Sequence, residues 1–186
     1  MTVRKLALGV VATAVFATAA TAQQQGPPPM PKPGPEHKIL AMDVGTWDAV
    51  MEMPAAPGAP PMTSKGVEVN TIGCGGLCLI TDFKGDLMPG VTFQGHGITT
   101  WDAAKKKYVG SWMDSMSAGI SRGESTYDAA SKKFTGWIEG PDTSGKVSKM
   151  KTTVEYPAPG TRVMTMWEAA SDAKETQTLK ITYKKR

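Results

Sequence analysis

The chain has 186 residues, of which 40% are hydrophobic and 20% are charged, and its formal net charge is +4. This length suits one domain with a buried core, and the apolar fraction is too high for a wholly disordered chain. Removing residues 1–22 and the basic end 184–186 leaves 16 of the 21 basic residues against 17 acidic ones. No basic surface is therefore expected for a nucleic acid partner.

Residues 1–22 have the three parts of an export signal. Arg4 and Lys5 form a positive start, Leu6–Ala20 is apolar, and Ala20-Thr21-Ala22 offers small residues for cleavage. The apolar run of about 15 residues is shorter than the roughly 20 that span a membrane, although a retained anchor is the alternative. We expect a secreted protein, periplasmic if the source is Gram-negative, with no stable membrane span after cleavage.

Residues 23–35, QQQGPPPMPKPGP, form a proline-rich segment. Proline lacks a backbone donor and favours extended conformations, so this segment is predicted to be a tether. A short helix is expected over Glu36–Val44, and Gly45 is a natural stop for it.

From Thr46 onward the sequence predicts strands separated by turns rich in glycine, proline and aspartate. Ten segments carry β-branched or aromatic residues with partial alternation: Trp47–Met53, Ser64–Ile72, Leu77–Lys84, Thr92–Trp101, Lys107–Met113, Gly119–Tyr127, Lys133–Glu139, Val147–Glu155, Arg162–Trp167 and Thr176–Tyr183. No helix separates them, so these strands are expected to form an antiparallel meander within a single β-barrel domain over residues 36–186. Closure into an up-and-down barrel would remove its exposed edges. A two-sheet sandwich is the alternative.

Two predicted hairpins use the same turn. The segments 101–108 and 127–134 share the pattern aromatic-Asp-Ala-Ala, followed by two lysines and a second aromatic residue. Aspartate can bond its own turn backbone, which favours a tight connection in both places.

A series of short motifs resembles a known family. The motifs are Pro35-Glu36-His37-Lys38, Gly45-Thr46-Trp47-Asp48, Pro57-Gly58-Ala59-Pro60-Pro61, Ser64-Lys65-Gly66, Asp82-Phe83-Lys84-Gly85, Phe93-Gln94-Gly95-His96-Gly97, the run from Tyr108 to Met116, the run from Gly123 to Asp128, and the run from Glu175 to Tyr183. Together they resemble a bacterial, mostly secreted family known only as domain of unknown function 1579. The resemblance implies no activity. Gly45-x-Trp47 also resembles the first strand of lipocalins and other calycins, whose barrels hold small apolar ligands.

Cys74 and Cys78 flank a tight predicted turn. In an oxidising compartment, two cysteines whose Cα atoms approach to about 6 Å are expected to pair, so we predict a disulfide. A redox-active pair and a metal site are the alternatives, but the spacing C-x₃-C lacks a second pair of ligands.

Methionine is frequent, with 12 residues. Met51-x-Met53 and Met164-x-Met166 each place two thioethers on one face of a strand, because residues i and i+2 share a face. Methionine fills irregular apolar space, so these pairs are predicted to line a core or a pocket. A Cu(I) site, which favours soft sulfur ligands, is the alternative.

His37 and His96 are the 2 histidines, too few for a zinc site without other ligands. His96 lies between Gly95 and Gly97, and glycine on both sides leaves room for a group to approach the backbone. We expect His96 to contact a ligand. A strand histidine bonded to a neighbour and an axial haem ligand are the alternatives.

The carboxylates are scattered along the strands. Glu68 shares a face with Gly66 and Asn70, while Val67 and Val69 share the other. The sequence does not fix which face points inward, so no acid–base pair and no catalytic residue is assigned.

Together these features predict an exported calycin-like barrel that binds a small apolar molecule, without an assigned metal or cofactor. Trp47, Met51, His96 and Trp112 are the expected lining. One alternative is a hydrolase- or isomerase-like enzyme that uses inward carboxylates and His96, and another is a solid barrel with a structural role in the envelope. Interior volume distinguishes a binding barrel from a solid one. The sequence indicates neither the ligand nor the oligomeric state.

Overall fold

The computed structural model describes residues 29–55, 60–88, 90–169 and 175–186. The predicted signal peptide and the start of the tether therefore lie outside the described residues. Residues 32–186 form one compact unit, and the fold is the fold of this unit. In the described part of the chain, no helix combines the length and apolar composition that crossing a membrane requires.

In its described residues, the unit has one short helix, α1, and two 3₁₀ turns, of which η1 follows α1. It also has ten antiparallel strands, the number that the sequence predicted. Their bounds are α1 Pro35–Leu40, η1 Ala41–Asp43, β1 Gly45–Met53, β2 Met62–Gly73, β3 Cys78–Met88, β4 Val91–Asp102, β5 Lys107–Asp114, β6 Ser121–Asp128, β7 Lys133–Pro141, β8 Val147–Ala158, β9 Thr161–Ala169 and β10 Glu175–Lys185; a second 3₁₀ turn, η2 (Cys74–Gly76), joins β2 to β3.

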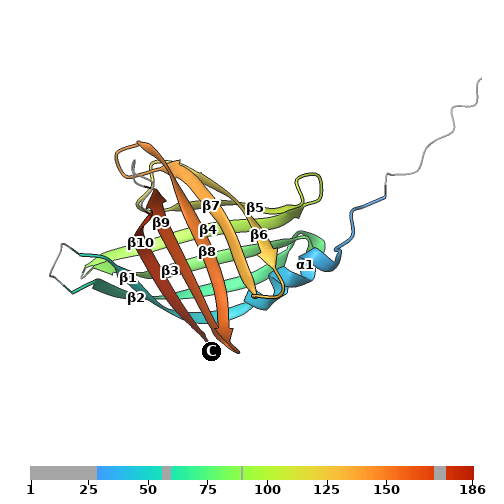
Figure 1. The fold of residues 1–186 in the computed structure, drawn as a ribbon, viewed down its shortest axis with the longest axis horizontal. Helices are drawn as coiled ribbons and strands as arrows, with labels where there is room; N and C mark the ends of the chain where they lie inside the picture. Colours follow the sequence, from blue (N-terminus) through green and yellow to red (C-terminus); the bar gives the residue numbers. More distant parts are fainter. Residues whose placement is uncertain (1–28, 56–59, 89, 170–174) are drawn as a thin grey trace, which may run out of the picture. The chain divides into compact units, whose positions relative to one another are not determined.

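The strands form a closed barrel in which each strand pairs with its neighbours in sequence (Figure 1). The ring closes between β1 and β10, where Trp47 lies opposite Lys185 and Met51 opposite Ile181. Among the ten described strands, closure leaves no open sheet edge, which is the physical reason for a barrel here. The barrel prediction is confirmed, and the two-sheet sandwich is excluded.

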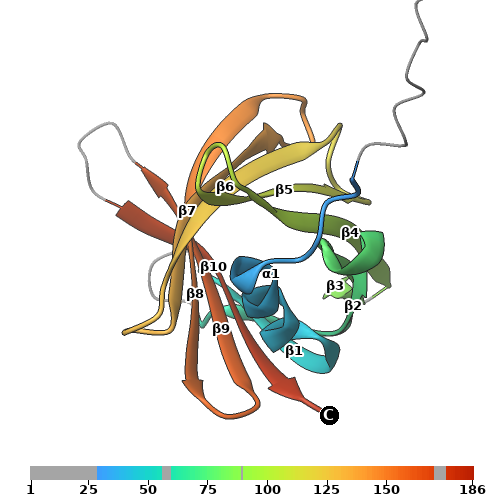
Figure 2. The ribbon, with the colours of Figure 1, turned by 90° about the vertical axis from the view of Figure 1, so that its right-hand side faces the viewer.

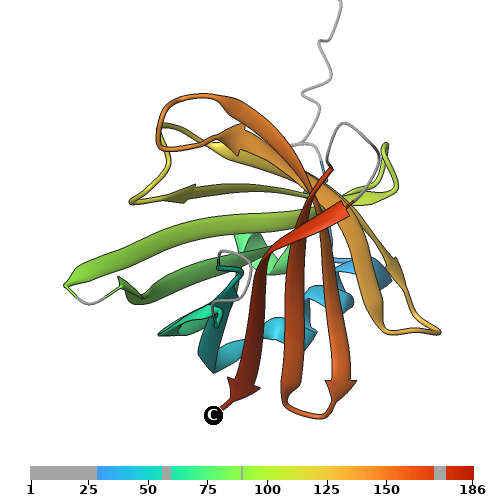
Figure 3. The ribbon, with the colours of Figure 1, turned by 60° about the vertical axis from the view of Figure 1, so that its left-hand side comes forward.

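Helix α1 covers one end of the ring of strands, the end that faces the viewer in Figure 2. In Figure 3, the blue helix α1 lies behind the orange strands of the C-terminal half. Leu40 packs into a buried cluster with Leu79 and Tyr108, and the Tyr108 hydroxyl donates to the carbonyl of Glu36 at 3.0 Å. This end of the barrel is therefore closed by apolar packing and by hydrogen bonds to the helix.

The expected helix over residues 36–44 is split into α1 and η1. The indole N–H of Trp47 donates to the carbonyl of Asp43 at 2.7 Å, which is the carbonyl that a longer α-helix would offer to the backbone N–H of Trp47. The Trp47 side chain thus occupies the Asp43 carbonyl, and the chain leaves α1 through the 3₁₀ turn η1.

Side chains alternate between the interior and the outer surface, as strand geometry requires. On β1, Trp47, Ala49 and Met51 are buried. On β2, Glu68 is only 5% exposed, whereas Val69 is 39% exposed. The polar face of β2 therefore points inward, which settles the orientation that the sequence left open.

The turn features of the sequence are also present. Asp102 accepts hydrogen bonds from the backbone of Ala104 and Lys105, and Asp128 accepts one from Ala130. At the β2–β3 turn, Cys74 and Cys78 form the predicted disulfide, with their Cα atoms 5.6 Å apart.

Candidate functional site

The barrel encloses a cavity of about 680 Å³. Its apolar wall is formed by inward side chains of β1, β3, β4, β5, β9 and β10, among them Met51, Phe83, Phe93, Trp112, Met164, Met166 and Ile181. Phe83 and Phe93 meet edge to face, with ring centroids 5.7 Å apart. The volume lies within the usual range for pockets that enclose a small molecule.

Methionine contributes a large part of this wall. The methionines that line the cavity are Met51, Met53, Met116, Met150, Met164 and Met166. Methionine side chains are flexible and polarizable, so they adapt to ligands of different shape. Among the described residues, no group of three or more histidine, cysteine, aspartate or glutamate side chains is placed to hold a metal ion. The two M-x-M pairs line the cavity, which fits their predicted role as pocket residues.

Four glycines line one side of the cavity. They are Gly97, Gly110, Gly123 and Gly140, and Gly110 lies directly opposite Gly123 across β5 and β6. The Trp112 ring covers Gly97, and Ser121 lies against Gly140. At Gly110 and Gly123 the wall contributes no side chain of its own to the cavity.

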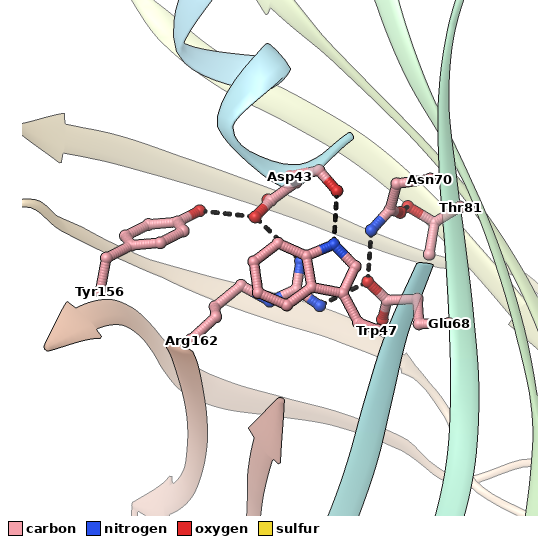
Figure 4. A network of polar contacts seen from close by, with 7 residues as sticks. All are labelled: Asp43, Trp47, Glu68, Asn70, Thr81, Tyr156 and Arg162. Atoms are coloured by element: carbon pink, nitrogen blue, oxygen red, sulfur yellow. Dashed lines mark hydrogen bonds and ion pairs between the residues drawn. The ribbon is translucent and has the colours of Figure 1, made fainter. Parts of the chain in front are cut away.

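A buried polar network forms the floor of the cavity beneath η1 (Figure 4). Arg162 of β9 is 5% exposed. Its guanidinium forms ion pairs with Asp43 of η1, at 2.9 Å, and with Glu68 of β2. Asn70 donates to Glu68 at 2.6 Å, and Tyr156 donates to Asp43 at 2.9 Å. The network therefore joins η1 to β2 and to the consecutive strands β8 and β9, which are far from β2 in sequence.

Aromatic rings enclose the Arg162 guanidinium. It lies 3.9 Å from the ring centroid of Tyr183 and 4.9 Å from that of Trp47. Burial works against its charge, but Asp43 and Glu68 outweigh that effect and raise the pKa of Arg162 above its ordinary value. Burial, followed by the charge of Glu68, raises the pKa of Tyr183 well above its ordinary value. Arg162 is therefore charged, and the Tyr183 hydroxyl keeps its proton near neutral pH.

The opposite end of the cavity is also acidic. The Trp112 indole N–H donates to one oxygen of Asp114 at 2.8 Å, and the other oxygen accepts the backbone N–H of Met116 and the hydroxyl of Ser117, both at 2.8 Å. The lining continues to Asp142 in the turn between β7 and β8. Asp114 thus fixes the orientation of Trp112 over the cavity.

The structure brings two of the four expected lining residues to the cavity wall, namely Met51 and Trp112. Trp47 also points inward, but it lies against Arg162 in the floor network and is 2% exposed. Whether any of them binds a ligand stays a prediction.

His96 is placed on the outer surface, which contradicts its expected position in the lining. Its side chain is 71% exposed and pairs with Asp82 on the neighbouring strand. The flanking glycines do leave room, but the indole of Trp112 fills it, because a Cβ at Gly95 or Gly97 would meet that ring. Since adjacent strand residues alternate, a histidine between two inward glycines must point outward. An axial haem ligand inside the barrel is therefore excluded at this position.

Sequence reasoning missed most of the floor network. The sequence shows that Glu68 and Asn70 share a face of a strand, but no pattern in it connects Asp43, Tyr156 and Arg162 with them. Arg162 lies 94 positions from Glu68 in sequence, and no local pattern predicts that contact. The nearest signal was Gly45-x-Trp47, since Trp47 packs against Arg162.

The chain matches one known sequence family and is similar in structure to other β-barrels. Residues 32–185 match the sequence family described as "Protein of unknown function (DUF1579)", and no curated protein shows significant sequence similarity. The structure is similar to that of an S-type phycobiliprotein lyase from Guillardia theta, with a TM-score of 0.55 and 11% identity, covering 81% of this chain and 92% of the other. A redesigned β-barrel is also similar, with a TM-score of 0.43 and 14% identity, covering 80% and 95%. At this level of identity the lyase shows the fold alone.

Proposed function

The chain belongs to the family of proteins of unknown function DUF1579, and we propose that it is a binding protein that holds a small, largely apolar molecule inside its barrel. The cavity of about 680 Å³ carries this proposal. A wall of flexible methionines and aromatic rings suits an apolar body, and the polar floor suits one polar end.

The glycine wall argues against a barrel with only a structural role. A barrel of about eight strands is just wide enough to be filled by its inward side chains or to hold one small ligand, and the interior widens as strands are added. Here Gly110 and Gly123 stand opposite each other on the lining and contribute no side chain that would fill a ten-stranded interior. An unfilled apolar interior lowers the free energy of unfolding, and a bound molecule would fill this space.

An enzyme remains the second candidate from the sequence, but the geometry gives it less support. His96 lies outside the barrel, so it cannot act together with inward carboxylates. The inward carboxylates Asp43 and Glu68 are both paired with Arg162, so both are already engaged within the floor network. The name of the phycobiliprotein lyase describes that protein, and its activity is not carried over.

We also propose that the protein is exported and that residues 1–22 are removed. The disulfide between Cys74 and Cys78 fits an oxidising compartment, because disulfides are rare in the cytosol. N-terminal sequencing of the protein from the periplasm of an expressing Gram-negative host tests this, and a first residue other than Gln23 would contradict it.

Binding can be tested with N-phenyl-1-naphthylamine, a neutral dye that fluoresces in apolar surroundings. We expect dye fluorescence with the native protein and its loss in Thr152→Trp, because Thr152 lines the cavity opposite Gly136. Thr135→Trp adds the same volume on the exposed outer face of β7 and should retain binding. Native mass spectrometry of protein purified without denaturant would identify a retained ligand.

Equal dye binding by native protein and Thr152→Trp would refute binding inside the barrel. Circular dichroism of both variants separates a blocked cavity from a failure to fold.

A further inference from the structure

We propose that the cavity selects ligands whose polar end is cationic or neutral and that it excludes carboxylates such as fatty acids. This inference rests on the proposed binding function and adds the chemical class of the ligand. The argument concerns the charge of the floor, the donors that the floor has left to offer, and the charge at the other end.

The floor carries more negative than positive charge. Arg162 brings one positive charge, whereas its two partners, Asp43 and Glu68, bring two negative ones. All three side chains are shielded from water, with exposed fractions of 6% for Arg162, 17% for Asp43 and 7% for Glu68. Charges in such surroundings are weakly screened. A carboxylate that reaches the floor therefore meets an uncompensated negative charge.

The described donors of the floor are directed at its own carboxylates. The two terminal nitrogens of Arg162 pair with Asp43 and Glu68. Tyr156 and Asn70 donate to the same two carboxylates. Each carboxylate has about four acceptor positions, of which these contacts fill two on each. A ligand hydroxyl, amine or ammonium group can donate to the remaining acceptor positions of Asp43 and Glu68. A ligand carboxylate cannot donate, so the ligand and the two floor carboxylates would all lose water without gaining a hydrogen bond.

The rest of the lining has the same sign. Asp114 and Asp142 lie toward the end opposite η1, and among the described residues that line the cavity Arg162 is the single basic one. The carboxylate of Glu124, whose residue also borders the cavity, pairs with two lysines, Lys105 and Lys107, whose side chains are 53% and 41% exposed, so it adds no negative charge to the lining. The field along the cavity therefore favours a cation at both ends.

A matched series of twelve-carbon amphiphiles tests the inference by displacement of N-phenyl-1-naphthylamine at pH 8. We expect dodecyltrimethylammonium and dodecan-1-ol to displace the dye at concentrations at least about tenfold lower than dodecanoate, a difference of about 1.4 kcal/mol. All three are used below the concentrations at which they form micelles.

The outcomes separate the two proposals. If dodecanoate displaces the dye as well as or better than the other two, the charge selectivity is overturned while binding in the cavity stands. If neither the dye nor any of the three amphiphiles binds, both the selectivity and the binding function are overturned.

Two charge variants locate the effect. Asp114→Asn removes one negative charge from the lining and should improve dodecanoate binding relative to dodecyltrimethylammonium by several-fold. Asp82→Asn removes one negative charge from the outer surface, where Asp82 is 57% exposed beside His96, and should leave the ratio unchanged. Equal ratios in both variants would overturn the assignment of selectivity to the lining. The dye affinity of each variant confirms that its cavity is intact.

Discussion

The buried ion pairs of Arg162 allow a quantitative prediction. Substitution Arg162→Met keeps most of the side-chain volume but removes the only positive charge among three groups. Asp43 and Glu68 then face each other's charge without compensation, and the guanidinium is lost from its position 3.9 Å from the ring centroid of Tyr183.

Removing one partner of a buried ion pair costs about 3–5 kcal/mol, because an unpaired charge remains in the interior. Here two charges of the same sign remain, which places the expected loss in the upper part of that range. For a domain of this size, each kcal/mol lowers the melting temperature by about 2–4 °C, so the variant should melt roughly 10–20 °C below the native protein.

The assay is urea denaturation followed by circular dichroism, together with thermal melting. Arg122→Met is the matched control, since Arg122 is exposed on the outer face of β6 and its loss should cost less than about 0.5 kcal/mol. The triple substitution Arg162→Met, Glu68→Gln and Asp43→Asn removes every charge of the network. It should regain much of the lost stability, because neutral replacement of a whole buried ionic group is often tolerated.

A triple variant no more stable than Arg162→Met would refute this reasoning. The cost would then come from lost packing against the aromatic rings and not from uncompensated charge.

Three further predictions concern other parts of the fold. Burial, and after it the charge of Glu36, raises the pKa of the Tyr108 hydroxyl to about 12. The unfolded chain therefore loses this proton at a lower pH than the folded protein, and the free energy of unfolding should fall as the pH rises from about 10 to 12. Urea denaturation should show a smaller fall in Tyr108→Phe. Replacing both Cys74 and Cys78 by serine should lower the free energy of unfolding by about 2 kcal/mol, since the disulfide closes a very short loop; an unchanged urea midpoint would contradict this. Gly95→Ala should displace the indole that covers it and shift tryptophan emission to longer wavelength, whereas an unchanged spectrum would show that the ring is held elsewhere.

The strands were predictable because their signals are local. Alternating residues and turn residues recur within each hairpin, and the aspartates at positions 102 and 128 bond their own turns as expected. The burial of each face was not predictable in the same way. On β2 a rule that places apolar residues inside would bury Val69 and expose Glu68, but the opposite holds, because Glu68 meets a partner from β9.

The candidate site was predictable only in part for the same reason. Met51 lies on the inner face because the regular alternation of β1 continues from Trp47. The glycines beside His96 correctly indicated free space, but the side chain that occupies this space, Trp112, comes from the neighbouring strand. The register between neighbouring strands decides which side chain occupies such a space, and the sequence of one strand does not specify that register.

The floor network connects the ligand cavity with η1. Asp43 lines the cavity, and it also receives Tyr156 and holds Trp47 through its carbonyl. A ligand that bonds to the floor should therefore stabilise η1 as well as the barrel. With ligand at a hundred times its Kd, the gain in stability is about 2.7 kcal/mol. Hydrogen exchange should then slow in residues 41–47, whereas a ligand lodged only near Asp114 would stabilise the barrel without this added protection. Unchanged exchange in 41–47 with a tightly bound cation would show that the floor is not its binding site.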